Sequence, residues 1–210
     1  MRVPTGDVNR KNLNLHHAVN ITDDFMRAVE RNEWWDLKDP NDDTVRDTMR
    51  ARKLWEQILE VRYRTGEPYL NFIDTANRAL PQTQKDKGLR IHGSNLCNEI
   101  HLPTSDDRTA VCCLSSVNVE LFEDWKKTTM IRDLVRFLDN VLQFFIDNAP
   151  DEISRARYSA EQERSLGLGA MGWHSFLHKK RIPFESEAAS VWNAVVFQHI
   201  QKEAIEESLR

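Results

Sequence analysis

The densest group of reactive residue types lies in residues 93–100, Gly-Ser-Asn-Leu-Cys-Asn-Glu-Ile, a segment that we call the cysteine loop. It places an amide, a thiol and a carboxylate at every second position, as Asn95, Cys97 and Glu99. Side chains alternate between two sides of an extended segment, so these three are expected to share one side. The spacing therefore predicts a candidate site around a single thiol.

A carboxylate close to a thiol disfavours the thiolate, because the two negative charges repel each other. Cys97 is therefore expected to be a poor thiolate nucleophile beside Glu99 and to suit chemistry of a neutral S–H group, such as hydrogen-atom transfer. Leu96 and Ile100 would anchor the opposite side of the segment. The structural alternative is a buried cysteine in a turn with solvated neighbours.

Two adjacent cysteines, Cys112 and Cys113, lie in a short apolar run, residues 110–114. Adjacent cysteines can form a disulfide only through a strained ring, so a mutual bridge is not expected. In a strand they face opposite sides, and at most one points toward a site that contains Cys97. Cys113 is predicted to pack as a small hydrophobe, whereas for Cys112 packing and a place in the site are equally open.

A zinc site is an alternative for the histidines and cysteines around the loop, namely His92, Cys97, His101 and Cys112 or Cys113. These residues lack the C-x-x-C or H-x-x-x-H spacing that structural zinc sites usually show. The sequence therefore predicts no metal site.

Residues 167–172, Gly-Leu-Gly-Ala-Met-Gly, match a dinucleotide-binding glycine pattern only superficially. The preceding residues 161–165 are polar and charged, so no strand is expected before the glycines, as that pattern requires. Close backbone packing at the start of a helix is the predicted role.

Composition limits the class of protein. The 210 residues are 40% hydrophobic and 30% charged with a net charge of −4, which favours a globular chain and argues against a basic nucleic-acid binder. No apolar run approaches the roughly 20 residues of a membrane span, and residues 1–20 lack the apolar core of a secretory signal. Three cysteines argue against a disulfide framework, so we expect a cytoplasmic protein. From the charge and the apolar runs we expect neither direct nucleic-acid contacts nor membrane contacts.

Hydrophobic periodicity predicts a helix-rich α/β fold. Helices are expected after the N-cap Thr22 and over residues 48–63, 129–148 and 186–209; strands over 69–73 and 110–114; and polar loops over 36–47 and 77–108. Two short strands do not make an independent sheet. Further strands are therefore expected in the loop-like regions or on another polypeptide.

The last predicted helix reaches the final residue without a stop signal, which suggests that the chain belongs to something longer. A segment taken from a larger fold would leave apolar faces uncovered, for instance at Val111, Leu138 or Trp192. Such patches drive association, so poor solubility or oligomers are expected for the chain alone.

Four stretches, in this order, resemble the large catalytic subunit of ribonucleotide reductase, and the resemblance runs through essentially all 210 residues. They are residues 65–74 (TGEPYLNFID), 94–100 (SNLCNEI) followed by 102–104 (LPT), 110–118 (AVCCLSSVN) and 164–172 (RSLGLGAMG). The most specific feature is the N-x-C-x-E pattern of the cysteine loop with a C-x-L-S run downstream.

In that family the cysteine loop is a finger that projects into a ten-stranded α/β barrel made of two five-stranded halves. The resemblance implies that residues 1–210 form the central segment of this barrel domain, without its N- and C-terminal parts. It implies that Cys97 becomes a thiyl radical and removes the hydrogen from C3′ of a ribonucleoside diphosphate. Glu99 would take the proton of the 3′-hydroxyl, Asn95 would bind the substrate, and Cys112 would be one of two redox-active cysteines.

The resemblance also implies partners. This segment would hold no cofactor directly, whereas the complete enzyme would use ATP and dNTP effectors, a metal-containing radical-generating subunit and a reductant of the thioredoxin or glutaredoxin type. The chain is expected to be inactive until the missing segments of the large subunit complement it. The alternative is a non-catalytic remnant that acts as a helical interaction module.

Overall fold

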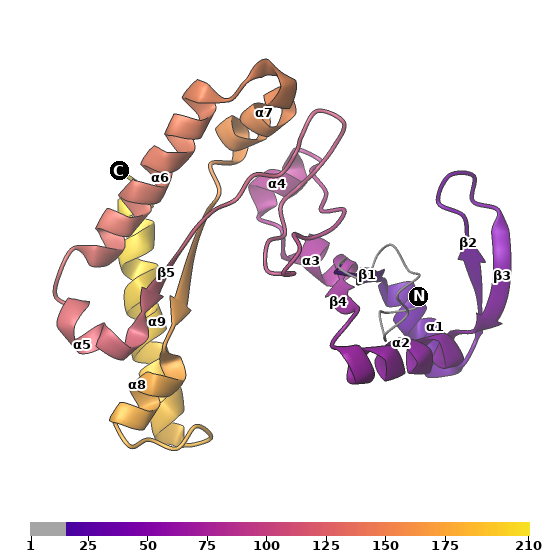
Figure 1. Cartoon of the computed structure of the whole chain (residues 1–210), viewed down its shortest axis with the longest axis horizontal. Helices are drawn as coiled ribbons and strands as arrows, with labels where there is room; N and C mark the ends of the chain where they lie inside the picture. The colour runs from indigo at the N-terminus through magenta and orange to yellow at the C-terminus, as the bar shows by residue number, and fades with distance from the viewer. Residues whose placement is uncertain (1–15) are drawn as a thin grey trace, which may run out of the picture. The chain divides into compact units, whose positions relative to one another are not determined.

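The computed structural model describes residues 16–210 (Figure 1). The chain divides into two compact units, with the boundary between Thr104 and Ser105. In the described residues the strands form three two-stranded sheets, two of them parallel and one antiparallel. Helices and strands alternate along the chain, which confirms the predicted α/β class.

The first unit contains strands and helices in the order β1 (Ala18–Ile21), α1 (Asp23–Arg31), β2 (Trp34–Lys38), β3 (Val45–Arg50), α2 (Ala51–Thr65), β4 (Tyr69–Phe72), α3 (Ile73–Ala79) and α4 (Gln82–Asp86). Helix α1 begins as predicted, because the Thr22 side chain accepts a hydrogen bond from the Phe25 amide at 3.2 Å. Phe25 is 5% exposed and packs between Trp35 and Trp55. Aromatic packing thus joins α1 to the hairpin and to α2.

The prediction of a surface loop over residues 36–47 is wrong, because β2 and β3 form an antiparallel hairpin there. Strand β3 is exposed except at Met49 and lacks the apolar alternation of a half-buried strand, while β2 shows that alternation only over Trp35 and Leu37. Thr48 belongs to β3, and helix α2 therefore begins three residues later than predicted. It ends at Thr65, two residues later than predicted, and is capped by Gly66 of the predicted stop signal, which adopts a left-handed conformation with φ +79°.

Strands β1 and β4 form a parallel pair, and the cysteine loop is hydrogen bonded to it through Asn98 Nδ2, which donates to the Leu70 carbonyl of β4. β4 was predicted from the sequence, while β1 was not. Their register places Asn20 opposite Asn71. The region 77–108, predicted as loop, contains the end of α3 and all of α4 and is otherwise without helices or longer strands.

The second unit contains β5 (Cys113–Asn118), the short 3-10 helix η1 (Val119–Leu121), α5 (Phe122–Trp125), α6 (Met130–Asn148), the 3-10 helix η2 (Asp151–Ile153), α7 (Ser154–Glu163), β6 (Leu166–Met171), α8 (Trp173–Lys179) and α9 (Glu187–Ser208). The two long helices match their predicted ranges within one residue at each end. Strands β5 and β6 pair in parallel.

The core of the second unit joins the β5–β6 pair to helices α6, α8 and α9. Phe176 is its largest fully buried side chain, 1% exposed, with ring contacts to Phe122, Trp173 and Trp192. Leu138 of α6 is only 2% exposed, so the expectation of an uncovered face at Leu138 is wrong. It lies on the side of α6 that packs against β5. The other two residues of that expectation, Val111 and Trp192, are partly buried.

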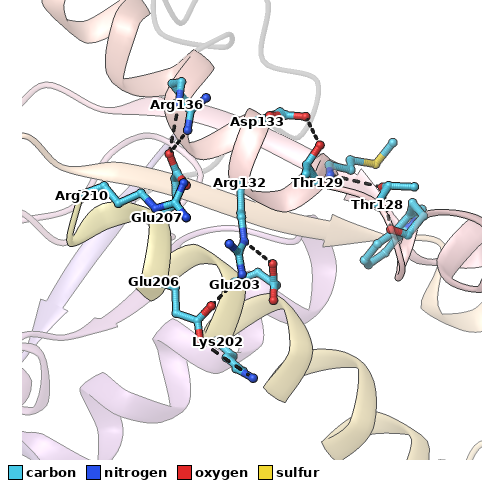
Figure 2. A network of polar contacts seen from close by, with 12 residues as sticks. Thr128, Thr129, Arg132, Asp133, Arg136, Lys202, Glu203, Glu206, Glu207 and Arg210 are labelled. Carbon is cyan, nitrogen blue, oxygen red and sulfur yellow. Dashed lines mark hydrogen bonds and ion pairs between the residues drawn. The ribbon is translucent and has the colours of Figure 1, made fainter.

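Charged side chains also join α6 to α9 (Figure 2). Arg132 of α6 donates hydrogen bonds to Glu203 at 2.5 Å and to Glu206 at 2.7 Å. The Arg132 guanidinium lowers the pKa of the Glu203 carboxyl through this hydrogen bond. One turn further along α6, Arg136 contacts Glu207, which is buried. The two long helices are thus held by apolar packing and by ion pairs.

The glycine-rich stretch over residues 167–172 corrects another prediction, because most of it is strand β6 and only Gly172 stands at a helix start. A Cβ atom at Gly167 would lie 2.2 Å from Leu114 Cδ2, and one at Gly169 would lie 2.9 Å from Ser116 Oγ. These glycines therefore permit the close approach of β6 to β5.

Candidate functional site

The cysteine loop is a turn and not an extended segment. The amide N–H of Asn98 donates to the Asn95 carbonyl at 3.1 Å, and Asn98 adopts a left-handed conformation with φ +67°. The predicted two-residue alternation of Asn95, Cys97 and Glu99 is therefore wrong. Asparagine tolerates this backbone conformation better than most residues, so Asn98 can close the turn without glycine.

The turn nevertheless brings Asn95 and Glu99 together. Asn95 Oδ1 accepts hydrogen bonds from the backbone amides of Glu99 at 3.1 Å and Ile100 at 3.0 Å. Asn95 Nδ2 donates to Glu99 Oε1 at 2.6 Å. The Asn95 side chain thus holds the backbone of the loop through its amide oxygen and orients the Glu99 carboxylate through its amide nitrogen.

Cys97 lies within the turn between these two residues and is exposed. Among residues 16–210 its thiol has no hydrogen-bond partner. Leu96, expected to anchor the loop, is 62% exposed, so only the partly buried Ile100 fits that prediction. The loop presents its sulfur to the surface of the first unit and is held mainly by polar contacts.

Two residues that sequence reasoning did not select also hold the loop. Asn98 Nδ2 donates to the Leu70 carbonyl of β4 at 3.2 Å, and Ser94 Oγ donates to Asn98 Oδ1 at 2.7 Å. Asparagine at the third position after Asn95 is the signal that could have indicated a turn. The loop is therefore attached to β4 by a side chain from its own tip.

Cys112 belongs to the second unit, where it is exposed and stands immediately before β5. The strand predicted over residues 110–114 thus begins three residues later. An apolar run without alternation is typical of a strand buried on both faces, but Leu114 is 48% exposed, so that interpretation is wrong. The β5 side chains alternate in exposure, and the apolar composition of the run concealed this alternation.

Cys113 packs as the sequence predicted. It is partly buried beside Leu142 and Ile146 of α6, and its Sγ donates to the Leu138 carbonyl at 3.4 Å. Burial raises the pKa of the Cys113 thiol, because a desolvated thiolate is disfavoured. This thiol is a packing group.

The histidines considered for zinc have other partners. His101 Nε2 lies 2.8 Å from Asn71 Oδ1, and His92 Nδ1 lies 3.2 Å from Thr104 Oγ1. Within the described part of the chain, no group of three His, Cys, Asp or Glu side chains could hold a metal ion. A search of the same residues for a helix with the length and apolar character of a membrane span found none.

The comparison with protein families matches the ribonucleotide reductase barrel domain over residues 1–210. The chain belongs to this family. It is similar to several large subunits of ribonucleoside-diphosphate reductases. A Frog virus 3 (isolate Goorha) protein assigned to these large subunits is 62% identical over 208 residues, which cover 98% of this chain and 37% of that protein.

The large subunit from Invertebrate iridescent virus 3 is 39% identical over 250 residues, covering 93% of this chain and 40% of the relative. Among solved structures, the Actinobacillus ureae class Id ribonucleotide reductase alpha subunit matches with a TM-score of 0.79 and 36% identity, over 92% of this chain and 35% of that chain. The chain thus spans about two fifths or less of the length of these relatives and corresponds to a segment of the large subunit.

Proposed function

We propose that this chain carries the radical loop of a ribonucleoside-diphosphate reductase and acts within an enzyme completed by further large-subunit segments. Cys97 is the hydrogen-atom acceptor: its thiyl radical forms an S–H bond while the C3′–H bond of the ribose breaks and leaves a carbon radical. The observation that supports this role best is the Asn95–Glu99 hydrogen bond, which joins the amide and the carboxylate that flank the exposed Cys97 in sequence.

Glu99 is the general base in this proposal, since its carboxylate can accept the proton of the 3′-hydroxyl as the carbon radical develops. Glu99 Oε1 already accepts one hydrogen bond from Asn95, which fixes the direction of the carboxylate. The second N–H of the Asn95 amide has no partner among residues 16–210 and can donate to the substrate. Orientation by a neighbouring amide is what a positioned base requires.

Reduction at C2′ removes a hydroxyl group as water and needs two electrons. Two thiols supply them by losing their hydrogens and forming one disulfide. Cys112 is the exposed candidate for one thiol, whereas Cys113 is packed against α6. Since the chain has three cysteines and Cys97 carries the radical, the second thiol comes from another segment of the large subunit.

The partners in this proposal are a ribonucleoside diphosphate, the complementary large-subunit segments, a metal-containing radical-generating subunit and a reductant of the thioredoxin or glutaredoxin type. ATP and dNTP effectors act on the complete enzyme, while this segment binds no cofactor directly. Turnover supports DNA synthesis and takes place in the reducing cytoplasm, where the free thiols persist.

The test combines the chain with the remaining large-subunit segments, the radical-generating subunit and a dithiol reductant. Dithiol-dependent formation of deoxyribonucleoside diphosphate is expected from the combination and not from the chain alone. Cys97→Ser should abolish it while the complex still assembles, because a hydroxyl group is a much poorer hydrogen-atom carrier than a thiol.

Cys113→Ser is the matched control, since it changes a cysteine that packs and does not react. It should leave the turnover number within about threefold of the unmodified complex. Turnover that survives Cys97→Ser would contradict the proposal. Assembly without any turnover would favour the non-catalytic interaction module.

A further inference from the structure

Both ends of the cysteine loop are tied to the β1–β4 pair by one continuous chain of hydrogen bonds. Before the loop, the His92 carbonyl accepts from Asn20 Nδ2 at 3.0 Å. Asn20 Oδ1 accepts from Asn71 Nδ2 at 2.8 Å, and Asn71 Oδ1 lies 2.8 Å from Nε2 of His101, after the loop. We call these four residues the amide clamp. The clamp closes a ring around the loop through the side chains of two strands.

The strand register explains why the clamp can form. Asn20 and Asn71 are direct partners in the parallel β1–β4 pair, so their side chains lie on the same side at the same level. Asn71 is 3% exposed, and both ends of its amide are used within the clamp. A buried amide is costly to leave unpaired, so the loss of either partner is expected to disturb the others.

The direction of the hydrogen bonds fixes the role of the imidazole. Asn71 Nδ2 donates to Asn20, which leaves Asn71 Oδ1 as the acceptor toward His101. Nε2 of His101 must therefore carry a hydrogen and act as a donor. Only a side chain that places a hydrogen-bond donor beside Asn71 Oδ1 can replace His101 here, and an aliphatic side chain has no donor.

We propose that His101 and Asn71 are positioning residues that fix the cysteine loop for hydrogen-atom transfer at Cys97. The inference rests on the proposed function, since it assigns residues that act through that thiol and do not touch the substrate. The loop has little apolar anchoring, as the exposure of Leu96 shows, so polar ties must set the place of the sulfur. Hydrogen transfer is sensitive to displacements of about 1 Å, and a loosened loop slows it.

The test uses His101→Ala and the rescue variant His101→Gln, whose side-chain amide restores a donor. The matched control is His92→Ala, which keeps the backbone carbonyl that the clamp uses and removes a histidine side chain whose contact, with Thr104 Oγ1, lies outside the clamp. A second variant, Asn20→Asp, keeps the acceptor for Asn71 and removes the donor to His92. Asn20 is exposed, so this variant tests the clamp even if a change at the buried Asn71 prevents folding.

Two readouts are measured: amide hydrogen exchange of residues 95–101 in the chain, and kcat and KM for the nucleoside diphosphate in the completed enzyme. His101→Ala and Asn20→Asp should speed the exchange and lower kcat about tenfold, with KM changed by less than about twofold. His101→Gln should recover most of kcat, and His92→Ala should match the unmodified chain.

Equal exchange and equal kcat in His101→Ala and His92→Ala would overturn the clamp. A rise in KM with kcat unchanged would overturn the positioning role as well, because it would indicate lost substrate binding. Faster exchange in His101→Ala together with no turnover in any complex, the unmodified one included, would support the clamp and overturn the proposed function.

Discussion

The cysteine loop and the helical second unit are stabilised in different ways. The loop is held by side-chain amides, with Asn95 bonding the backbone of Glu99 and Ile100. The second unit is held by apolar packing around Phe176 and by the row of buried α6 residues on β5. Polar contacts can thus position a reactive side chain at a surface, where hydrophobic burial would hide it.

Cys97 and Cys113 show the same contrast within one residue type. Cys97 is exposed in a turn, whereas Cys113 is partly buried with its Sγ bonded to the Leu138 carbonyl. The surroundings, and not the residue type, separate a candidate radical carrier from a packing group. Matched substitutions and labelling in the two regions measure this contrast.

The largest difference is expected for stability. Phe176→Ala removes a side chain that is 1% exposed and should lower the free energy of unfolding by about 3–5 kcal/mol, because it leaves a cavity among aromatic rings. Leu96→Ala, at a residue 62% exposed, should cost less than about 0.5 kcal/mol. Urea denaturation of both variants measures these values, and similar losses would show that the loop is part of a core.

A smaller effect is expected for thiol reactivity. Burial raises the pKa of the Cys113 thiol and covers its sulfur, so iodoacetamide should label it at least about tenfold more slowly than Cys97 in the native chain. Mass spectrometry of peptides after timed labelling at pH 8 gives both rates. The rates should converge in denaturant. Equal rates in the native chain would remove the contrast between the two cysteines.

The smallest effect concerns pH and the α6–α9 ion pairs. The hydrogen bond from Arg132 lowers the pKa of Glu203, so its stabilisation is present above the ordinary glutamate range and is lost as the pH falls through the lowered value. Glu203→Gln should therefore lower the melting temperature slightly at pH 7, and this loss should shrink as the pH falls toward 3.

Glu185→Gln is the control, because Glu185 is exposed and has no ion pair among the described residues. It should leave the melting temperature unchanged at both pH values. A Glu203→Gln loss that persists at pH 3 would show that packing, and not the ion pair, is responsible.

The long helices could be predicted from the sequence because their apolar residues recur with the helical period and their starts carry Thr or Ser. Helices α6 and α9 matched the prediction, and so did the Thr22 cap. The hairpin of β2 and β3 could not be predicted, since β3 is exposed except at Met49 and the apolar alternation of β2 covers only Trp35 and Leu37. Strand β6 could not be predicted because glycine is uncommon in strands. Its glycines are explained only by the close approach of β5, where a Cβ atom would meet Leu114 or Ser116.

The geometry of the candidate site could not be predicted from the sequence. The residue types of Asn95, Cys97 and Glu99 favour the proposed chemistry, but their spacing suggested an extended segment. The turn depends on the left-handed conformation of Asn98 and on the bond of its side chain to β4, which a local pattern does not encode. The clamp residue Asn20 was missed because its role depends on strand pairing with Asn71.

The most direct test of the central claim is the rate of reduction of a ribonucleoside diphosphate that carries deuterium at C3′, measured in the completed enzyme under single-turnover conditions. If Cys97 removes this hydrogen, the deuterated substrate should react more slowly than the ordinary one, and Cys97→Ser should abolish the reaction of both. Equal rates for the two substrates, together with turnover in Cys97→Ser, would contradict the account.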